Sequence, residues 1–146
     1  MKKKISDSLV ETNQLVLPED TNLLGNLLGG KTMHWIDIAA ALTAAKHSNR
    51  TVATVSIEKI NFKKPIKKGK LVCIKSHLVW TGRTSMVIDV DVYSEDLFSG
   101  EREKTTDARL TFVALNENGR PVKVPGIEFE NEEQKKVFEE IQKEKE

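Results

Sequence analysis

The distribution of apolar and polar residues predicts a strand, a loop and a buried helix in the first third of the chain. Loosely spaced apolar residues over 9–17 suggest a strand, which the Pro-Glu-Asp sequence at 18–20 ends. Residues 22–30 contain three glycines and two asparagines, residue types that tolerate positive φ and let the backbone approach a neighbour closely. We expect a loop there.

The helical pattern of residues 29–47 is apolar nearly all round. One side has spacings of three and four and comprises Met33, Ile36, Asp37, Ala40, Ala41 and Ala44. The other side is apolar through Trp35, Ile38 and Leu42. Such a helix is buried, and its alanines allow a sheet to pack closely against it. We therefore expect it to be the central helix of the domain.

Four segments with strand composition follow the helix, and no second helix interrupts them. They span residues 51–62, 71–80, 84–94 and 105–115. The last two alternate between apolar and polar residues, as in a sheet with one face covered and one face solvated. In the first, the apolar positions change parity at Glu58 and Lys59, which predicts a β-bulge or a sharp twist.

This order of elements is typical of an α+β fold in which a long antiparallel sheet curls around one helix. We expect one domain over residues 1–127 and a charged tail over 128–146. In the tail, one apolar stripe of a short helix would comprise Phe129, Val137, Phe138 and Ile141. The pattern leaves open whether this helix docks on the domain or frays.

Composition excludes several classes of protein. The chain has 146 residues, of which 38% are hydrophobic and 31% charged, values that argue against disorder and against a membrane span. Its formal net charge of +1 provides no large cationic field for binding nucleic acid. No apolar segment of signal-peptide length follows Met1, so we expect a cytoplasmic protein that does not bind membranes.

The sequence also gives no support for a metal centre. Cys73 is the only cysteine, and its strand-like neighbours indicate a structural thiol rather than a nucleophile. The three histidines lack the spacing of metal ligands. We expect no metal.

Asp37 is the main candidate for a catalytic residue, because it interrupts the apolar face of the predicted helix. A buried carboxylate needs a hydrogen-bond partner, a raised pKa or a catalytic task. A hydrogen bond to the backbone, or an ion pair with Lys or Arg, would account for it without function. Asn26 and the glycines at 29 and 30 favour function, since a helix N-terminus offers unpaired N–H groups to a developing oxyanion.

The distance between these candidates suggests a site shared by two subunits. At about 1.5 Å of rise per residue, Asp37 lies roughly 10 Å beyond Gly30 along the helix axis. The oxyanion donors and the aspartate of one subunit are then too far apart to act on the same carbon atom.

Several short motifs, taken in order, resemble those of the cytosolic acyl-CoA thioester hydrolases of the hotdog superfamily. They lie at 17–22, 25–30, 33–37, 54–56, 61–65, 82–85 and 111–115, and the likeness covers residues 15–125. The resemblance implies a hotdog fold, with a five-stranded antiparallel sheet wrapped around one long helix. It also implies a homodimer whose sheets join edge to edge, assembled further into a hexamer as a trimer of dimers.

The resemblance implies roles for three residues. Asp37 matches the catalytic carboxylate, Asn26 matches the asparagine that faces it from the partner subunit, and Gly30 would offer the N–H that polarises the thioester carbonyl. We favour general-base activation of water by Asp37, with a covalent anhydride as the rival. No cofactor is implied, because coenzyme A is part of the substrate and of the product.

The likeness also assigns a corner of the molecule to the phosphates of the coenzyme. That corner comprises Arg83, Thr84 and Ser85, and an arginine suits phosphate through its planar fork of donors. Lys64, in a lysine-rich turn at 63–68, would add attraction. Surface charges with no ligand would also explain these residues.

Two other functions stay open. A non-catalytic module that binds acyl-CoA or has a regulatory role would keep the cleft without turnover, although both Asp37 and Asn26 are retained. A dehydratase of the same fold would place a histidine in the catalytic position, and only His34 is near. The sequence does not fix the preferred acyl chain.

Overall fold

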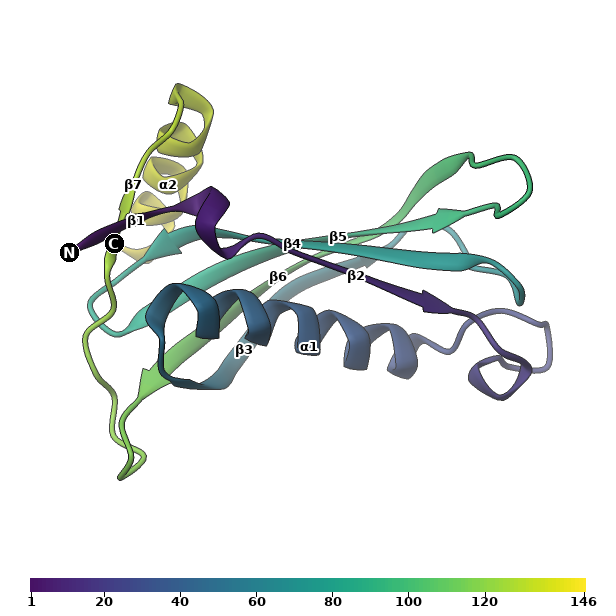
Figure 1. Cartoon of the computed structure of the whole chain (residues 1–146), viewed down its shortest axis with the longest axis horizontal. Coiled ribbons are helices and arrows are strands. Elements are labelled where there is room, and N and C mark those ends of the chain that lie inside the picture. The colour runs from purple at the N-terminus through teal and green to yellow at the C-terminus, as the bar shows by residue number, and fades with distance from the viewer.

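One long helix lies along a five-stranded antiparallel sheet (Figure 1). The computed structural model describes residues 1–146. Its elements are β1 (Lys2–Lys4), a 3₁₀ turn (Ile5–Ser8), β2 (Val10–Leu15), a 3₁₀ turn (Pro18–Asp20), α1 (Gly29–Ser48), β3 (Thr51–Phe62), β4 (Leu71–Thr81), β5 (Ser85–Glu95), β6 (Arg102–Leu115), β7 (Gly126–Glu128) and α2 (Glu132–Lys145). The sheet has the order β2-β4-β5-β6-β3, and β1 pairs with β7 in parallel. The predicted α+β fold is confirmed.

The core lies between α1 and the concave face of the sheet. The alternation of β5 and β6 is confirmed, because their inward residues are buried: Met86, Ile88, Val90, Val92, Ala108, Leu110, Phe112 and Ala114. On α1 they meet Ile36, Ala40 and Ala44, which are also buried. Ile38 and Leu42 remain 44% and 45% exposed on the side away from the sheet, so in the single chain α1 is not buried all round.

β3 is an edge strand with two β-bulges. Its register with β6 shifts between Thr54 and Ser56 and again between Ile57 and Lys59. The second shift confirms the bulge predicted from the change of parity. The first shift was not predicted, because Val55 has the apolar character of an inward residue although it stands outside the ladder.

The charged tail forms a helix that docks on the outer face of the sheet, opposite α1 (Figure 1). Ile141 is 2% exposed and packs with Val79, Trp80 and Val87. Trp80 Nε1 donates to Gln142 Oε1 at 2.9 Å. This packing explains why Val87 is apolar at an outward position of β5. Neither α1 nor α2 combines the length and the hydrophobicity of a membrane-spanning helix.

The last turn of α1 contains a buried histidine. Nε2 of His47 donates to the Pro125 carbonyl at 2.7 Å, which fixes α1 to the segment before β7, and Nδ1 has no partner. Burial lowers the pKa of His47, with a smaller contribution from Lys3, while the bond to Pro125 and the charge of Asp7 act in the opposite direction. The folded protein therefore favours the neutral imidazole.

This burial predicts a stability that depends on pH near neutrality. Because the folded pKa lies below the unfolded value of 6.5, the contribution of neutral His47 to stability is present above pH 6.5 and is lost as the pH falls from there through the folded pKa. We expect the free energy of unfolding to decrease by at most about 1.4 kcal/mol per pH unit as the pH falls below 6.5. Urea unfolding of the wild type and of His47→Gln, which removes the titrating group, measures this.

His34→Gln is the control, because His34 is exposed on the same helix. An equal dependence on pH in the wild type and in His47→Gln would contradict the assignment.

Candidate active site

Asp37 lies midway along α1, on the side that faces the edge strand β3. Gly29, Met33 and Asp37 follow one another at intervals of four residues, so they form one line along the helix. Asp37 is half-buried, and its Oδ1 accepts a hydrogen bond of 2.9 Å from Oγ1 of Thr54. The partner is therefore a hydroxyl of β3, and neither the backbone bond nor the ion pair considered from the sequence is formed.

Thr54 is a site residue that the sequence analysis missed. It lies on the inward face of β3, opposite the buried Phe112 of β6, with Val52 two residues before it on the same face. A polar residue on this face was the available signal. The contact itself depends on the packing of α1 against β3, which the pattern did not specify.

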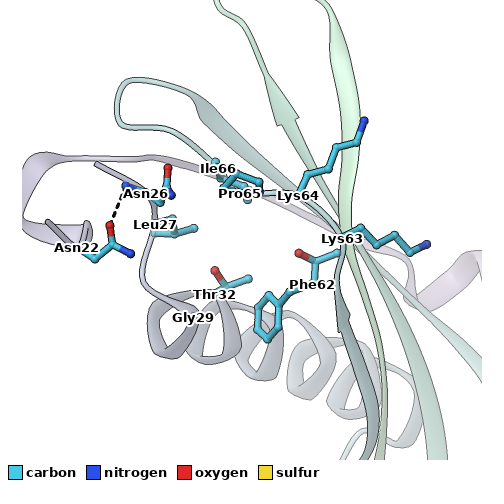
Figure 2. Close-up of a pocket in the computed structure, with 11 residues that line it drawn as sticks. Asn22, Asn26, Leu27, Gly29, Thr32, Phe62, Lys63, Lys64, Pro65 and Ile66 are labelled. Atoms are coloured by element: carbon cyan, nitrogen blue, oxygen red, sulfur yellow. Dashed lines mark hydrogen bonds between the residues drawn. The ribbon is translucent and has the colours of Figure 1, made fainter. Parts of the chain in front are cut away.

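A pocket of about 350 Å³ lies at the N-terminal end of α1 (Figure 2). Its wall comes from the loop before α1, the first turn of α1, the end of β3 and the turn that follows. The lining includes Asn22, Asn26, Gly29, Phe62, Lys63 and Lys64. A Cβ at Gly29 would lie 3.8 Å from the ring of Phe62, whereas a Cβ at Gly30 would meet nothing within 4 Å. The backbone at Gly30 is therefore open to a ligand.

The first amides of α1 are free donors beside this pocket. The N–H groups of Gly29, Gly30 and Lys31 donate to no acceptor in the chain, and Leu28 provides no side-chain cap. Unpaired amides and the helix dipole together give this end a partial positive charge. The arrangement suits an anion or an oxygen that acquires negative charge.

The side chain of Asn22 organises the loop before α1, and Asn26 follows in the same loop (Figure 2). Oδ1 of Asn22 accepts from the N–H groups of Leu24 at 2.9 Å and Asn26 at 3.2 Å. The amide NH₂ of Asn22 makes no hydrogen bond within the chain. The side-chain oxygen of Asn26 is buried and has no partner. Both asparagines thus keep hydrogen-bonding capacity that the single chain does not use.

The predicted residues lie in three separate regions: the pocket, the part of α1 outside the pocket lining, and a turn at the other end of the sheet. Asn26 and Lys64 line the pocket, whose lining includes Gly29 but neither Gly30 nor Asp37. The turn that holds Arg83, Thr84 and Ser85 lies at the other end of the sheet, where the carbonyl of Thr84 accepts from Ala114, the ladder partner of Val52. Arg83 is exposed and forms no ion pair. One chain therefore does not bring these groups together.

Of the four lysines in the turn at 63–68, two form ion pairs with carboxylates and two do not. Lys63 lies 2.7 Å from Asp107 and Lys64 pairs with Glu103. The hydrogen bond from Lys63 lowers the pKa of Asp107, and Asn61 adds to this effect. Lys67 and Lys68 form no ion pair. Much of the positive charge expected to attract phosphates is thus neutralised within the chain.

The remaining nucleophile and metal-ligating types form no second site. Cys73 is fully buried, and burial raises the pKa of its thiol. This environment agrees with a structural thiol. No three His, Cys, Asp or Glu side chains are grouped so that they could hold a metal ion.

Comparisons of sequence connect the chain with one family. A model described as the thioesterase superfamily matches residues 24–97. A protein of Bacillus subtilis named as an uncharacterized acyl-CoA thioester hydrolase is 43% identical over 128 residues, 88% of this chain and 74% of that protein. The cytosolic acyl coenzyme A thioester hydrolase of Rattus norvegicus is 38% identical over 86% of this chain. The aligned part is only 34% of the length of the rat protein.

Comparisons of structure agree. An apo-hexameric acyl-CoA thioesterase superposes with a TM-score of 0.94 at 42% identity, covering 99% of this chain and 92% of the other. An acyl-CoA hydrolase from Staphylococcus aureus, solved with butyryl coenzyme A and coenzyme A, gives a TM-score of 0.90 at 34% identity. That superposition covers 98% of this chain and 87% of the other.

Proposed function

The chain belongs to the thioesterase superfamily, and on this basis we propose that it hydrolyses the thioester bond of acyl-coenzyme A at a site between two subunits. The observation that carries the proposal is the hydrogen bond between Asp37 and Thr54, in which a hydroxyl of β3 holds a half-buried carboxylate of α1. The N-terminal amides of the same helix are free. Names and structures of relatives supply the chemical class: acyl-CoA hydrolases, one of them with butyryl coenzyme A.

The edge strand β3 supports a two-fold dimer. Its outer edge is unpaired in the single chain, and Val55 and Ile57 are 60% and 40% exposed. Antiparallel pairing of two β3 strands about their middle would set the Thr54 end of one beside the Phe62 end of the other. Because Phe62 lies against Gly29, this pairing brings the helix N-terminus of one subunit towards Asp37 of the other. Ile38 and Leu42 would be covered at the same time.

The residue that completes the site from the partner is an asparagine, and two candidates exist. Asn26 is the one indicated by the resemblance of the motifs. The Staphylococcus aureus hydrolase has been characterised as variants with alanine at an asparagine, an aspartate and a threonine, spaced by 15 and 17 residues. In this chain the same intervals separate Asn22, Asp37 and Thr54. We therefore assign the catalytic role to Asn22, whose Oδ1 holds the loop and whose amide NH₂ is free, while the side-chain oxygen of Asn26 has no partner in the chain.

The chemistry then follows from the placement of donors and acceptors. Thr54 orients the carboxylate of Asp37, which takes a proton from water as that water attacks the thioester carbonyl. The amide NH₂ of Asn22 from the partner holds the water, and the N–H of Gly30 from the same partner stabilises the oxyanion. Collapse of the tetrahedral intermediate breaks the C–S bond, and the proton held by Asp37 passes to the departing thiolate, which releases coenzyme A and a carboxylic acid. Direct attack by Asp37, through an anhydride, is the competing route.

We also propose an oligomeric state and a cellular location for the protein. The similar structures include enzymes named as hexameric, and we propose a homodimer as the minimum unit and a trimer of dimers as the complete assembly. We place the protein in the cytoplasm, as the cytosolic relatives suggest. No cofactor takes part, since coenzyme A enters as part of the substrate.

Asp37→Asn tests the proposed catalytic role. The amide keeps the shape and the bond to Thr54 but removes the base, so we expect kcat for acyl-CoA hydrolysis to fall by roughly 10²–10⁴-fold. Release of free coenzyme A measures activity, and light scattering checks that the oligomer is intact. Near-normal turnover would reject the enzymatic assignment, and acyl-CoA binding without hydrolysis by the wild type would favour a binding module.

Mixed oligomers test whether the site is shared. Asp37→Asn and Asn22→Ala subunits are each expected to be nearly inactive alone. In a mixed two-fold dimer one site carries both substitutions and the other carries neither, so random mixing should restore about a quarter of wild-type activity. The double variant Asp37→Asn/Asn22→Ala, mixed with itself, is the control.

If the two residues act within one subunit, mixing restores nothing. The same experiment with Asn26→Ala in place of Asn22→Ala decides between the asparagines, because only loss of the catalytic one abolishes activity and is complemented.

Arg83→Ala tests recognition of the coenzyme. Loss of a charge-assisted contact to phosphate should raise KM for acyl-CoA roughly tenfold and leave kcat nearly unchanged. An acyl-pantetheine thioester lacks the nucleotide, and its kinetics should not respond. Lys136→Ala, an exposed charge on α2, is the matched control. Equal effects on both substrates would show that Arg83 does not contact the nucleotide end.

A further inference from the structure

We propose that Glu58 is a positioning residue for the substrate pocket. In this inference, which rests on the proposed function, its carboxylate holds the second bulge of β3 against the C-terminal helix. The bulge in turn fixes which side chains of β3 face the pocket. The C-terminal segment, outside the pocket itself, thereby contributes to the binding of the acyl substrate.

The bulge at Glu58 decides the orientation of every residue that follows it in β3. Ile57 pairs with Leu110 and Ile60 with Ala108, so both face α1, and Phe62 shares this face through its partner Thr106. Side chains alternate along a strand, so pairing Glu58 into the ladder, with loss of the bulge, would shift the register by one and turn the next residues over. Lys59 and Asn61 would then face the helix, and Ile60 and Phe62 would face outward.

A buried hydroxyl holds Glu58 in its bulged position. Glu58 stands outside the ladder, and its Oε1 accepts a hydrogen bond from Oγ1 of Thr111 on β6. Thr111 is only 6% exposed, and its ladder partner Val87 packs with Ile141 of α2. A buried hydroxyl without a partner is costly, so Thr111 has few alternatives to this acceptor. The bond therefore favours the bulged register over the unbulged one.

The last turn of α2 contacts Glu58 from the outer face of the sheet. Nζ of Lys145 lies 3.8 Å from Oε1 of Glu58 and 5.0 Å from the centre of the Trp80 ring. The same turn is anchored by Ile141, which is 2% exposed, and by the bond from Trp80 to Gln142. Thr111 and Lys145 thus both contact the partly exposed carboxylate of Glu58, although α2 lies on the face of the sheet away from the pocket.

The residue of β3 that contacts Asp37 and the residue of β3 that lines the pocket lie on opposite sides of the bulge. Thr54 precedes both bulges, and its ladder contact with Phe112 orients it towards Asp37. Phe62 follows both bulges and lines the pocket near Gly29. Disturbing Glu58 should therefore alter the pocket wall and leave the pair of Asp37 and Thr54 in place. The expected signature is a higher KM with a retained kcat.

Steady-state hydrolysis of a series of acyl-CoA substrates of increasing chain length tests the inference. We expect Glu58→Ala to raise KM roughly tenfold for the acyl chains that bind best, with kcat within about twofold of wild type. Glu58→Gln keeps an acceptor for Thr111 and should restore KM to within about twofold. Thr111→Val should reproduce the effect of Glu58→Ala, and the double variant should add little to either. Hydrogen exchange of residues 59–62 should rise in step with KM.

The controls separate a positioning role from a loss of stability. Lys59→Ala alters the neighbouring exposed residue and should leave KM unchanged. If Glu58→Ala does not assemble, Lys145→Met and Thr111→Val decide in its place. Wild-type KM in all three, or a fall of kcat that follows melting temperature with KM constant, would overturn the inference. An inactive wild type would instead reject the proposed function.

Discussion

Close packing between α1 and the concave face of the sheet is the interaction on which the rest of the structure depends. Ala40 and Ala44 are fully buried there, and their small side chains let the strands approach the helix backbone closely. Only at such a separation can a short hydroxyl on β3 reach a carboxylate on α1, as Thr54 reaches Asp37 at 2.9 Å. The alanines are thus a condition for the candidate site as well as for the core.

The same packing leaves one margin of the domain, formed by the outer edge of β3 and the adjoining side of α1, without a partner. β3 pairs with β6 on one side only, and the side of α1 away from the sheet remains apolar. A long unpaired edge with exposed apolar residues is a liability for a monomer unless another chain covers it. Asp37 lies at this margin. If a second copy of the chain pairs with β3, the same contact therefore covers the exposed apolar residues and completes the candidate site.

Features that depend on local period were predictable from the sequence, and features that depend on distant contacts were not. The alternation of β5 and β6 and the change of parity at Glu58 follow from side-chain direction along a strand, and both were predicted. The partner of Asp37 depends on how β3 and α1 pack across 17 residues of chain. The pairing of Lys64 with Glu103 joins residues 39 apart along the chain, so the run of lysines could not indicate which carboxylate each lysine would meet.

These ion pairs bear on how a long anionic substrate would lie across the dimer. Lys63 and Lys64 are engaged by carboxylates of β6, whereas Arg83 is free at the opposite end of the sheet. Antiparallel pairing of β3 reverses one subunit against the other, so the Arg83 end of one subunit approaches the helix N-terminus of its partner. An arginine without an internal partner can then meet phosphate at no cost of breaking an ion pair. The proposed two-fold arrangement, which would unite Asp37 with the free amides, would thus also bring an unpaired cation to the same side.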